Sequence, residues 1–433
     1  MLQVLFSVWA LLLGMLLLML GNGMQATLIG IRGGIEGFTT LELSIVMSGY
    51  FAGFLLGSRL TPTMIRRVGH VRVFAALASM VSAILILYPS ITAPWAWVIL
   101  RVAFGFCFSG VYVTAESWLN NSVANENRGK ALSLYLIVQM GGMVMAQGLL
   151  LFGDASGFIV FVIPSVLVSL SFLPILLSIN PTPSFQTAKP LSLVALYRIS
   201  PLGCVGVLIL GGVYGALYGM PAVYGSAAGM TLTQIPVFVA AIMTGALVFQ
   251  YPLGWLSDRM DRRRLIMAVS ILGGLSAMAG VALGSFFPAL LAVAFLVGGL
   301  SNPLYGLLIA YTNDFLEGDD MAAASGGLIF LNGVGAIAGP IVTGWALGQV
   351  GPSGFWLFIG ALMLASGGYA GWRMLRRPVV PTPDETSRFA PIGPTATPVA
   401  LEVAQELYAE AQEALGETAT EKDTDAARQD GAA

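Results

Sequence analysis

The chain has 433 residues, of which 57% are hydrophobic and 10% are charged, and its mean hydropathy is +0.83. Because soluble globular proteins carry about 25% charged residues, this composition excludes a soluble protein. It predicts an all-α protein that crosses a membrane several times. The formal net charge of -2 hides a basic part before Pro378 and an acidic part after it.

Twelve apolar stretches are each long enough to span a bilayer as a helix. The first lacks the basic residues that open a signal peptide, so it is interpreted as a retained span. The stretches lie at about residues 5–31, 42–61, 73–90, 93–118, 131–152, 157–179, 201–225, 235–256, 265–286, 289–312, 322–348 and 353–375.

The basic residues predict how these spans are oriented. With the N-terminus in the cytoplasm, every Lys and Arg before Pro378 falls on the cytoplasmic side, except Arg32 and the intramembrane Arg101. Cytoplasmic loops are enriched in Lys and Arg. We therefore expect both termini to be cytoplasmic.

The charged segments recur at a nearly constant interval. A turn that begins at Asp258 separates two spans, and a similar segment that begins at Arg66 separates two earlier ones. Nearly the same interval separates Tyr112 from Tyr305. Such repetition predicts two six-span units in tandem, as in many secondary transporters.

The repeat defines the expected domains. They are an N-terminal six-helix half at residues 1–179, a cytoplasmic linker at 180–200, a C-terminal six-helix half at 201–377 and an acidic, mostly disordered cytoplasmic tail at 378–433. Within the tail, residues 399–415 have the composition of a helix. A solvated terminus without a specific role is favoured over a tail that docks on a partner.

Several motifs resemble the major facilitator superfamily, and the resemblance covers residues 1 to about 377. Gly254-x3-Asp258-Arg259-x-Asp261-Arg262-Arg263 is similar to the superfamily's signature between consecutive helices of a half. The first copy departs from it, with Pro62 and Arg66 at the positions of Gly254 and Asp258. Arg101-x3-Gly105 in the fourth span is a second family feature. The Gly-Pro run from Gly333 to Gly344 resembles a motif of efflux members.

A narrower resemblance is carried by Tyr112-Val-Thr-Ala-Glu-Ser-Trp-Leu-Asn120 and the following Asn125-Glu-Asn-Arg-Gly129. These residues look like a group of bacterial facilitators of the YcaD-like type. The sequence is also similar to riboflavin importers of alpha-proteobacteria, although no single residue carries that similarity. The resemblance implies the major facilitator fold: a monomer in the bacterial inner membrane whose two halves rock about a central cavity.

Arg101 is the only basic residue placed well inside a span. An arginine at that depth is costly unless it faces water or a partner, and a cap on backbone carbonyls at a kink is the alternative. If spans one, four, seven and ten line the cavity, as the superfamily arrangement implies, the cavity candidates are Asn22, Gln25, Arg101, Tyr112, Tyr214, Tyr218, Asn302 and Tyr305. Tyrosines and amides suit a flat, polar solute.

Charged residues near the cytoplasmic helix ends form a predicted gate. Glu116 is interpreted as a latch that pairs with Arg66 or Arg67, in preference to a proton-coupling carboxylate. In the second half, Asp258, Asp314 and Arg262 are candidates for the equivalent contact. The full predicted set is Arg66, Arg67, Arg72, Glu116, Asp258, Arg259, Arg262 and Asp314.

Other polar and small residues receive structural interpretations. His70, the sole histidine, is expected to be exposed in a basic loop. Tyr88, Tyr224 and Tyr311 are predicted to be interfacial anchors. Gln139, Gln147 and Asn332 are predicted to join helices through their amides. Gly49, Gly53 and Gly57 are predicted to allow close packing of helices.

The pattern predicts a secondary transporter of a small organic solute that works by alternating access. Neither a metal site, a cofactor nor a nucleic-acid partner is expected, and no nucleophile and base stand in positions that match an enzyme. Uptake of a flat polar solute such as a vitamin and efflux of drugs or metabolites are both open, as is coupling to protons or another ion. The alternative is a membrane solute sensor or assembly factor that uses the same fold without transport.

Overall fold

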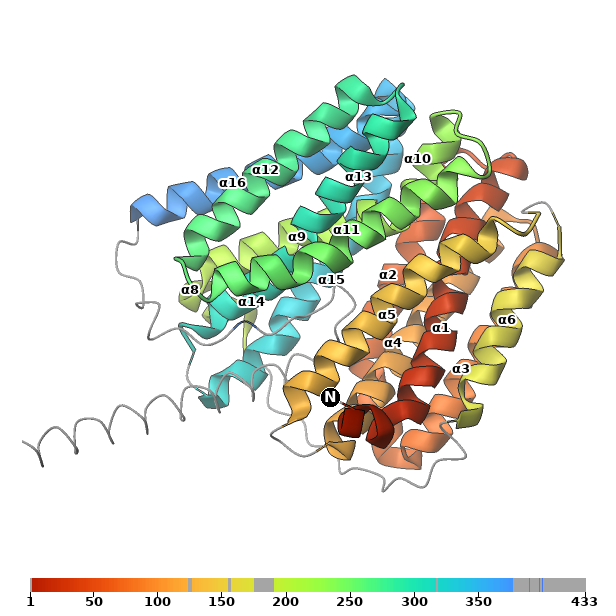
Figure 1. The fold of residues 1–433 in the computed structure, drawn as a ribbon, viewed down its shortest axis with the longest axis horizontal. Coiled ribbons are helices and arrows are strands. Elements are labelled where there is room, and N and C mark those ends of the chain that lie inside the picture. The colour runs from red at the N-terminus through yellow and green to blue at the C-terminus, as the bar shows by residue number, and fades with distance from the viewer. Residues whose placement is uncertain are drawn as a thin grey trace, which may run out of the picture.

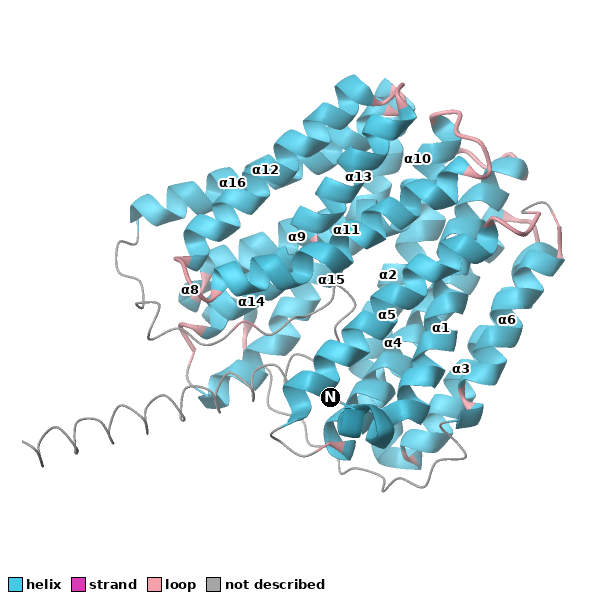
Figure 2. Ribbon diagram, in the orientation of Figure 1, coloured by secondary structure: helices cyan, strands magenta, loops and turns pink. Residues whose placement is uncertain are grey.

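The computed structural model describes residues 2–123, 127–154, 157–174, 191–316 and 318–376, together with Phe389, Thr397 and Val399. Every regular element among them is a helix (Figure 2). In chain order these are α1 (Leu2–Ile35), α2 (Thr40–Val68), α3 (His70–Ser90), α4 (Pro94–Ser122), α5 (Arg128–Leu150), α6 (Ile159–Ser171), α8 (Leu193–Ile199), α9 (Pro201–Gly219), α10 (Pro221–Ala227), α11 (Gln234–Ser257), α12 (Arg262–Leu283), α13 (Phe287–Ser301), α14 (Pro303–Asn313), α15 (Gly318–Val350) and α16 (Ser353–Arg376).

Eleven helical segments of the described chain are long and apolar enough to cross a membrane, and α6 is a shorter apolar helix of 13 residues. The prediction of an all-helical membrane protein is therefore confirmed. The predicted linker contains α8, while its residues 180–190 lie outside the described residues. So does the helix predicted at 399–415, apart from Val399.

The structure corrects the predicted loop at residues 62–72. Residues 62–68 continue α2, and α3 begins at His70. Only Gly69 interrupts the helices, with a φ of +85°, a left-handed conformation that glycine adopts without steric cost. Pro62 does not end α2, because prolines are tolerated inside membrane helices. The basic residues of this segment therefore lie on helix ends.

Two predicted spans are broken by proline. Residues 201–225 form α9 and α10, which meet at Met220 and Pro221, and residues 289–312 form α13 and α14, which meet at Asn302 and Pro303. Proline cannot donate the backbone hydrogen bond that a continuous helix requires. Each break therefore leaves backbone carbonyls for other donors.

The helices form two groups, α1–α6 and α8–α16 (Figure 1). In the first group, α1 packs against α5 and α6, and α2 packs against α4. In the second, α9 packs against α15 and α16, and α11 packs against α13. The groups meet where α2 contacts α15, α5 contacts α11 and α1 contacts α10.

Consecutive spans alternate in direction, so the C-terminal ends of α2, α4 and α11 lie at one end of the molecule. We call it the basic end, because it carries Arg66, Arg67, Arg72 and the arginines of 259–264. At the opposite end the two groups pack closely: a Cβ added to Gly30 would lie 2.6 Å from the Cβ of Ala222, and one added to Gly344 would lie 2.4 Å from that of Ser44. Figure 1 shows α5 and α11 diverging toward the basic end.

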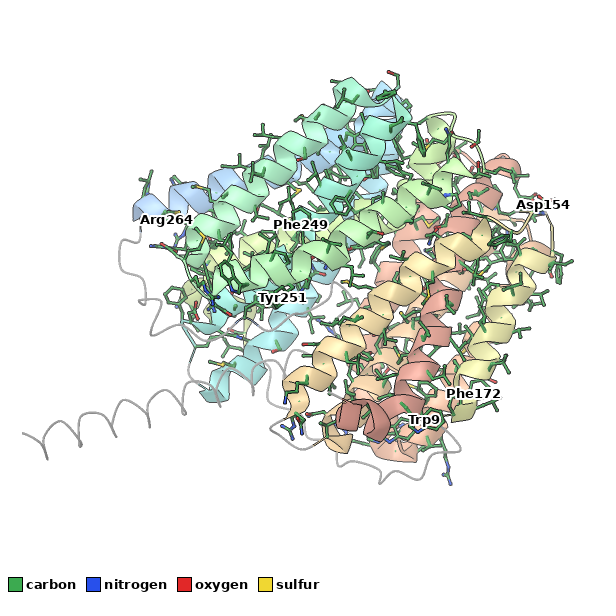
Figure 3. The ribbon with its side chains drawn as sticks, viewed as in Figure 1. Trp9, Asp154, Phe172, Phe249, Tyr251 and Arg264 are labelled. Carbon is green, nitrogen blue, oxygen red and sulfur yellow. The ribbon has the colours of Figure 1, made fainter. Side chains whose placement is uncertain are left out.

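The outer surface is apolar and aromatic. Tyr251 is 80% exposed and Trp9 is 55% exposed, and both are labelled in Figure 3. Many leucines, isoleucines and valines on the same surface are also exposed. Water would not tolerate such an extended apolar surface, whereas lipid does. The chain is a multi-pass membrane protein.

Burial overturns two structural interpretations. His70 is 2% exposed, and its Nε2 lies 3.0 Å from Ser117 Oγ on α4, so it is not a loop residue. The predicted interfacial anchors Tyr88, Tyr224 and Tyr311 are at most 5% exposed. Tyr224, for example, accepts a hydrogen bond of 2.9 Å from Trp356 Nε1. These tyrosines join helices to one another and do not face lipid.

Glycines bring paired helices into backbone contact. A Cβ on Gly53 of α2 would lie 1.9 Å from the carbonyl oxygen of Val102 on α4, and one on Gly105 would lie 2.0 Å from that of Tyr50. A Cβ on Gly245 of α11 would likewise lie 1.9 Å from the Phe295 carbonyl oxygen. Small residues allow this approach in membranes. The close-packing interpretation of Gly49, Gly53 and Gly57 is confirmed.

We expect Gly53→Ala to destabilise the protein, because its methyl group would overlap a backbone oxygen that cannot rotate away. Overpacking costs about 1–3 kcal/mol, whereas the helix propensity of alanine returns about 1 kcal/mol. The melting temperature in detergent should therefore fall. Gly141→Ala is the matched control, because nothing lies within 4 Å of its added Cβ. It should leave the melting temperature unchanged or raise it, and equal effects of the two changes would contradict the packing argument.

Candidate functional site

A cavity lies between the two groups of helices and holds about 1200 Å³ of space, including the part that opens to solvent. Pockets for small organic ligands commonly hold about 300–1000 Å³. The lining includes four methionines and several aromatic rings, and Arg101 is its only Lys, Arg, Asp or Glu among the described residues. The lining residues are Met19, Asn22, Ala26, Tyr50, Phe51, Phe54, Leu55, Arg101, Tyr112, Gln139, Met140, Met143, Tyr214, Tyr218, Met243, Ala246, Tyr305, Ile329, Asn332, Gly333 and Ala336.

Arg101 of α4 dominates the wall that the first group contributes. Its side chain is 3% exposed, and its Nη1 donates a hydrogen bond of 2.5 Å to Gln25 Oε1 on α1. Its Nη2 lies 3.4 Å from the sulfur of Met47 on α2. The guanidinium also lies 5.1 Å from the ring centroid of Tyr50, a distance at which cation–π attraction operates.

The opposite wall is organised around the break between α13 and α14. Tyr214 Oη of α9 donates to the backbone carbonyl of Asn302 at 2.9 Å, and Tyr218 Oη donates to the Oδ1 of the same residue at 2.9 Å. Asn302 Nδ2 donates in turn to Gln250 Oε1 on α11 at 3.0 Å. The break thus provides acceptors for Tyr214 and Tyr218, and these bonds fix both side chains at the cavity.

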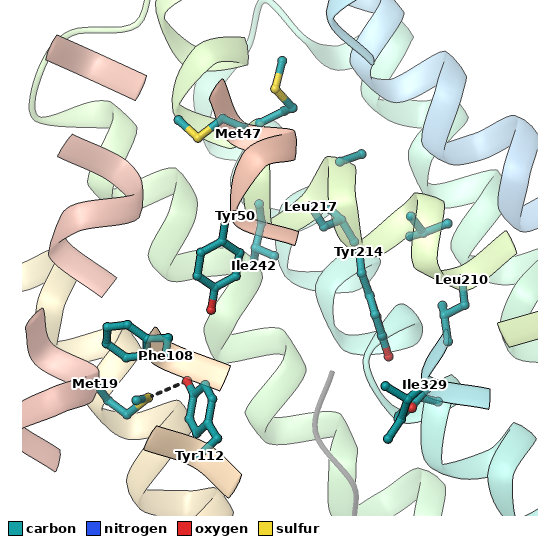
Figure 4. Close-up of a cluster of buried hydrophobic side chains, with 14 of the residues drawn as sticks. Met19, Met47, Tyr50, Phe108, Tyr112, Leu210, Tyr214, Leu217, Ile242 and Ile329 are labelled. Carbon is teal, nitrogen blue, oxygen red and sulfur yellow. Dashed lines mark hydrogen bonds between the residues drawn. The ribbon is translucent and has the colours of Figure 1, made fainter. Parts of the chain in front are cut away.

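Six of the eight predicted cavity residues line the cavity: Asn22, Arg101, Tyr112, Tyr214, Tyr218 and Tyr305. The other two lie behind the wall, where Gln25 holds Arg101 and Asn302 holds Tyr218. Figure 4 shows Tyr50 and Tyr112 on the first group and Tyr214 across from them. Tyr112 Oη donates to Met19 Sδ at 3.2 Å.

Sequence reasoning misses the contribution of α2 and α5. Tyr50, Phe51 and Phe54 line the cavity, as does Gln139. The glycines of the second span assign it to packing against another helix, and its aromatic residues are therefore not predicted to line the cavity, although Tyr50 follows Gly49 directly. The available signal is helical spacing, because Tyr50, Phe51 and Phe54 fall within about 100° of one another around the helix and therefore share one face.

Two of the three predicted helix-joining amides do join helices. Gln147 Nε2 donates to the Gly23 carbonyl at 3.0 Å and links α5 to α1. Asn332 Nδ2 donates to the Val207 carbonyl at 3.4 Å and links α15 to α9 while it also lines the cavity. Gln139 instead lines the cavity, and its Nε2 is buried without a hydrogen-bond partner in the described part of the chain.

Charged side chains gather at the basic end. Arg262 Nη1 lies 2.5 Å and 2.7 Å from the two carboxylate oxygens of Asp314, and Arg262 Nη2 lies 3.8 Å from Asp258 Oδ1. Arg262 and Asp314 are 3% and 4% exposed. Glu116 accepts a hydrogen bond of 3.4 Å from Tyr135 Oη and another from Thr397 Oγ1.

The other predicted gate residues lie around these groups. The Arg259 guanidinium sits 4.1 Å over the ring of Trp255, and Arg66 Nη2 donates to Thr63 Oγ1 at 3.1 Å. Arg67 and Arg72 are exposed at the junction of α2 and α3. No group of three or more His, Cys, Asp or Glu side chains that could hold a metal occurs among the described residues.

The sequence matches the pattern of the Major Facilitator Superfamily over residues 11–244 and 202–407. It is 28% identical to the MFS-type transporter YcaD of Salmonella typhi over 88% of this chain and 98% of that protein, and 29% identical to YcaD of Escherichia fergusonii over 78% and 87%.

Solved structures share the fold. The nucleoside transporter NupG aligns with a TM-score of 0.73 at 16% identity, over 86% of this chain and 99% of that one. The human organic anion transporter MFSD10 aligns with a TM-score of 0.60 at 14% identity, over 84% and 98%. The helical architecture, the cavity between two helix groups and the sequence match agree, and the chain belongs to the major facilitator superfamily.

Proposed function

We propose that this protein is a secondary transporter that moves a small organic solute across the bacterial inner membrane by alternating access. The observation that carries the proposal is the cavity between the two helix groups. Both groups contribute polar side chains to it, Arg101 and Tyr112 from one and Tyr214 and Tyr305 from the other. A solute held by both walls would be exposed to either side in turn as the groups rock.

Rocking requires two comparable bodies, and we propose twelve spans in two six-helix repeats, residues 1–179 and 201–377. The packing pairs support this. The pairs α1 with α5, α2 with α4 and α3 with α6 recur as α9 with α15, α11 with α13 and α12 with α16. The close glycine contact of Gly53 with α4 recurs as that of Gly245 with α13.

We propose that the basic end faces the cytoplasm, with both termini on that side, because basic residues concentrate there. The two groups are packed together at the opposite end, where Ser44 meets Gly344 and Gly30 meets Ala222. The structure would then correspond to the state whose cavity is reached from the cytoplasm.

The charged residues at the basic end are proposed to close it in the other state. Arg262 ties α12 to Asp314 at the end of α14 and lies near Asp258 at the end of α11. Glu116, Arg66, Arg67 and the neighbouring arginines would form the corresponding contacts in the first half. A buried ion pair is costly to separate, so the Arg262–Asp314 pair would stay intact and keep the helix ends of the second half together as that half takes part in closing the basic end.

A disulfide that locks the closed end tests the proposal even before the solute is identified. Gly348 of α15 faces Thr40 of α2 at that end: a Cβ on Gly348 would lie 4.0 Å from Thr40 Oγ1, so two cysteine side chains at these positions would be within reach of each other. Thr40→Cys and Gly348→Cys would be introduced into a chain whose native cysteines are replaced by alanine.

Reconstituted vesicles would be incubated with a metabolite mixture, under imposed pH and ion gradients, and their contents measured by mass spectrometry. We expect particular solutes to enter vesicles that contain the reduced double variant. Oxidation should abolish their entry, and a reductant should restore it. Either single variant is the control. Solutes that bind the purified protein but never cross under any gradient would contradict transport and favour a sensor.

A further inference from the structure

The charge of Arg101 has no counter-charge in the described part of the protein. Its described neighbours are an amide oxygen, a thioether, two aromatic rings and the buried Tyr88 hydroxyl, all of them neutral. Glu116 follows fifteen positions later on the same helix, about 22 Å away at 1.5 Å per residue. Glu42, at the start of α2, uses its Oε2 to accept hydrogen bonds of 2.8 Å from the Thr39 backbone N–H and hydroxyl.

An uncompensated cation at this depth is energetically unfavourable. The guanidinium stays protonated in proteins, and an unpaired buried ion costs several kcal/mol. Cation–π contacts with Tyr50 and Phe104 recover only part of that cost. The sulfur of Met47 is a weak acceptor, and the Nε of Arg101 is buried without a hydrogen-bond partner among the described residues. The edge of the guanidinium formed by Nε and Nη2 therefore lacks a strong acceptor there.

The other residues that line the cavity indicate the chemistry of the rest of the ligand. No Asp or Glu occurs among the described lining residues, so nothing there would repel an anion. Met19, Met140 and Met143 offer adaptable apolar contacts, and Tyr214 and Tyr305 present rings on the opposite wall. These surfaces suit a flat and largely apolar body that carries one charged group.

We infer that the transported solute is an organic anion. Its carboxylate, phosphate or sulfonate group takes the Nε and Nη2 edge of Arg101, and its flat body lies between the methionines and tyrosines of the two walls. Arginine pairs with such groups through two parallel hydrogen bonds. The inference rests on the proposed transport function and assigns a substrate class to the same site.

Matched probes test this assignment on the purified full chain. 2-Naphthoate, 2-naphthyl phosphate and naphthalene-2-sulfonate would be compared with the neutral 2-naphthamide by calorimetric titration. We expect at least one anionic probe to bind ten-fold or more tightly than the amide. Arg101→Gln should remove that preference and Arg101→Lys should retain part of it. Arg376→Gln, which removes a charge at the end of α16, should leave it intact.

Two further measurements distinguish an arginine that binds an anion from one that has a structural role. The melting temperature of Arg101→Gln without ligand should equal or exceed that of the unaltered protein, because a costly charge is gone; a large fall would identify Arg101 as structural and overturn the inference. Equal binding of the anions and the amide would also overturn it, even if vesicles show transport of neutral solutes. An anion preference without flux of any solute would instead count against the proposed transport alone.

A separate observation concerns Phe389 and Thr397, which follow α16 in the chain. The Phe389 backbone N–H donates to Asp258 Oδ1 at 2.6 Å, and its ring packs so closely on Gly254 that a Cβ there would lie 2.5 Å from Phe389 Cδ1. The Thr397 hydroxyl donates to Glu116 Oε2 and is fully buried. Asp258 and Gly254 belong to the second helix group, and Glu116 belongs to the first.

Phe389 and Thr397 are eight positions apart in the sequence and contact different helix groups at the basic end. A fully extended chain of that length reaches about 26–29 Å, which limits how far the groups can separate while both contacts hold. Closure of the basic end would also have to displace the buried Thr397 side chain from Glu116. Phe389 and Thr397 thus engage Asp258 and Glu116, two residues that the proposed gate uses.

We propose that these two contacts, of Phe389 with Asp258 and of Thr397 with Glu116, are autoinhibitory and hold the basic end in its present state. Phe389→Ala combined with Thr397→Val in the full chain should release it. The readout is the Thr40→Cys and Gly348→Cys crosslink at the opposite end, which forms only while that end is closed. We expect the release to slow crosslinking several-fold and to raise the rate of solute flux.

Thr233→Val makes the same chemical change at an exposed position on the opposite end and should alter neither quantity. This proposal would be overturned if the variant with Phe389→Ala and Thr397→Val showed unchanged crosslinking and flux together with an unchanged melting temperature. Because the crosslinking rate needs no solute, this outcome does not depend on whether the substrate is an anion.

Discussion

The structure depends on how closely helices can approach one another without help from water. Lipid removes the hydrophobic advantage of helix association, so helices in a membrane gain stability from close contact and from hydrogen bonds between them. Here Gly53 and Gly105 interlock α2 with α4, and Gly245 does the same for α11 with α13. Backbone contact of this kind leaves little freedom within each half. The motion that alternating access requires would therefore take place at the seam between the two helix groups.

That seam is built differently from the interior of each half. Ser44 meets Gly344 on the seam between α2 and α15, and the Ser48 hydroxyl donates to the Ile337 carbonyl. Farther along, Arg59 reaches across to the ring of Phe330 at 4.5 Å. These are small or adaptable contacts. Such a surface would seal one end and still separate in the rocking motion that we propose.

Much of this architecture can be predicted from the sequence, because the length and apolarity of membrane helices are imposed by the bilayer. The predicted stretches match the helices closely at most ends. Chemistry is harder to place, because it depends on which face of a helix points inward. Arg101 stands out through the rarity of an intramembrane charge, whereas Tyr50 does not, because aromatic residues are common in such spans.

Several wrong predictions share one physical origin, which is that a polar group need not be exposed. His70 has basic neighbours, yet it is buried against Ser117. Tyr88 lies near a helix end, where tyrosines often meet the lipid interface, but its ring stands edge-on to Trp97 at 5.6 Å. A single sequence records that a residue is amphipathic. It does not record whether the partner of its polar atom is water, lipid or another helix.

Two buried arginines show how partners set the role of a charge. Arg262 has the carboxylate of Asp314 within 2.7 Å, so its charge is balanced inside the protein. Arg101 has only neutral neighbours among the described residues, which is why we propose that an anionic solute balances its charge. Asp258 stands between these cases, because its Oδ1 lies 2.6 Å from the Phe389 backbone N–H and 3.8 Å from Arg262. Removal of the Phe389 contact would let Asp258 move toward Arg262, so a single carboxylate couples Phe389 to the buried Arg262–Asp314 ion pair.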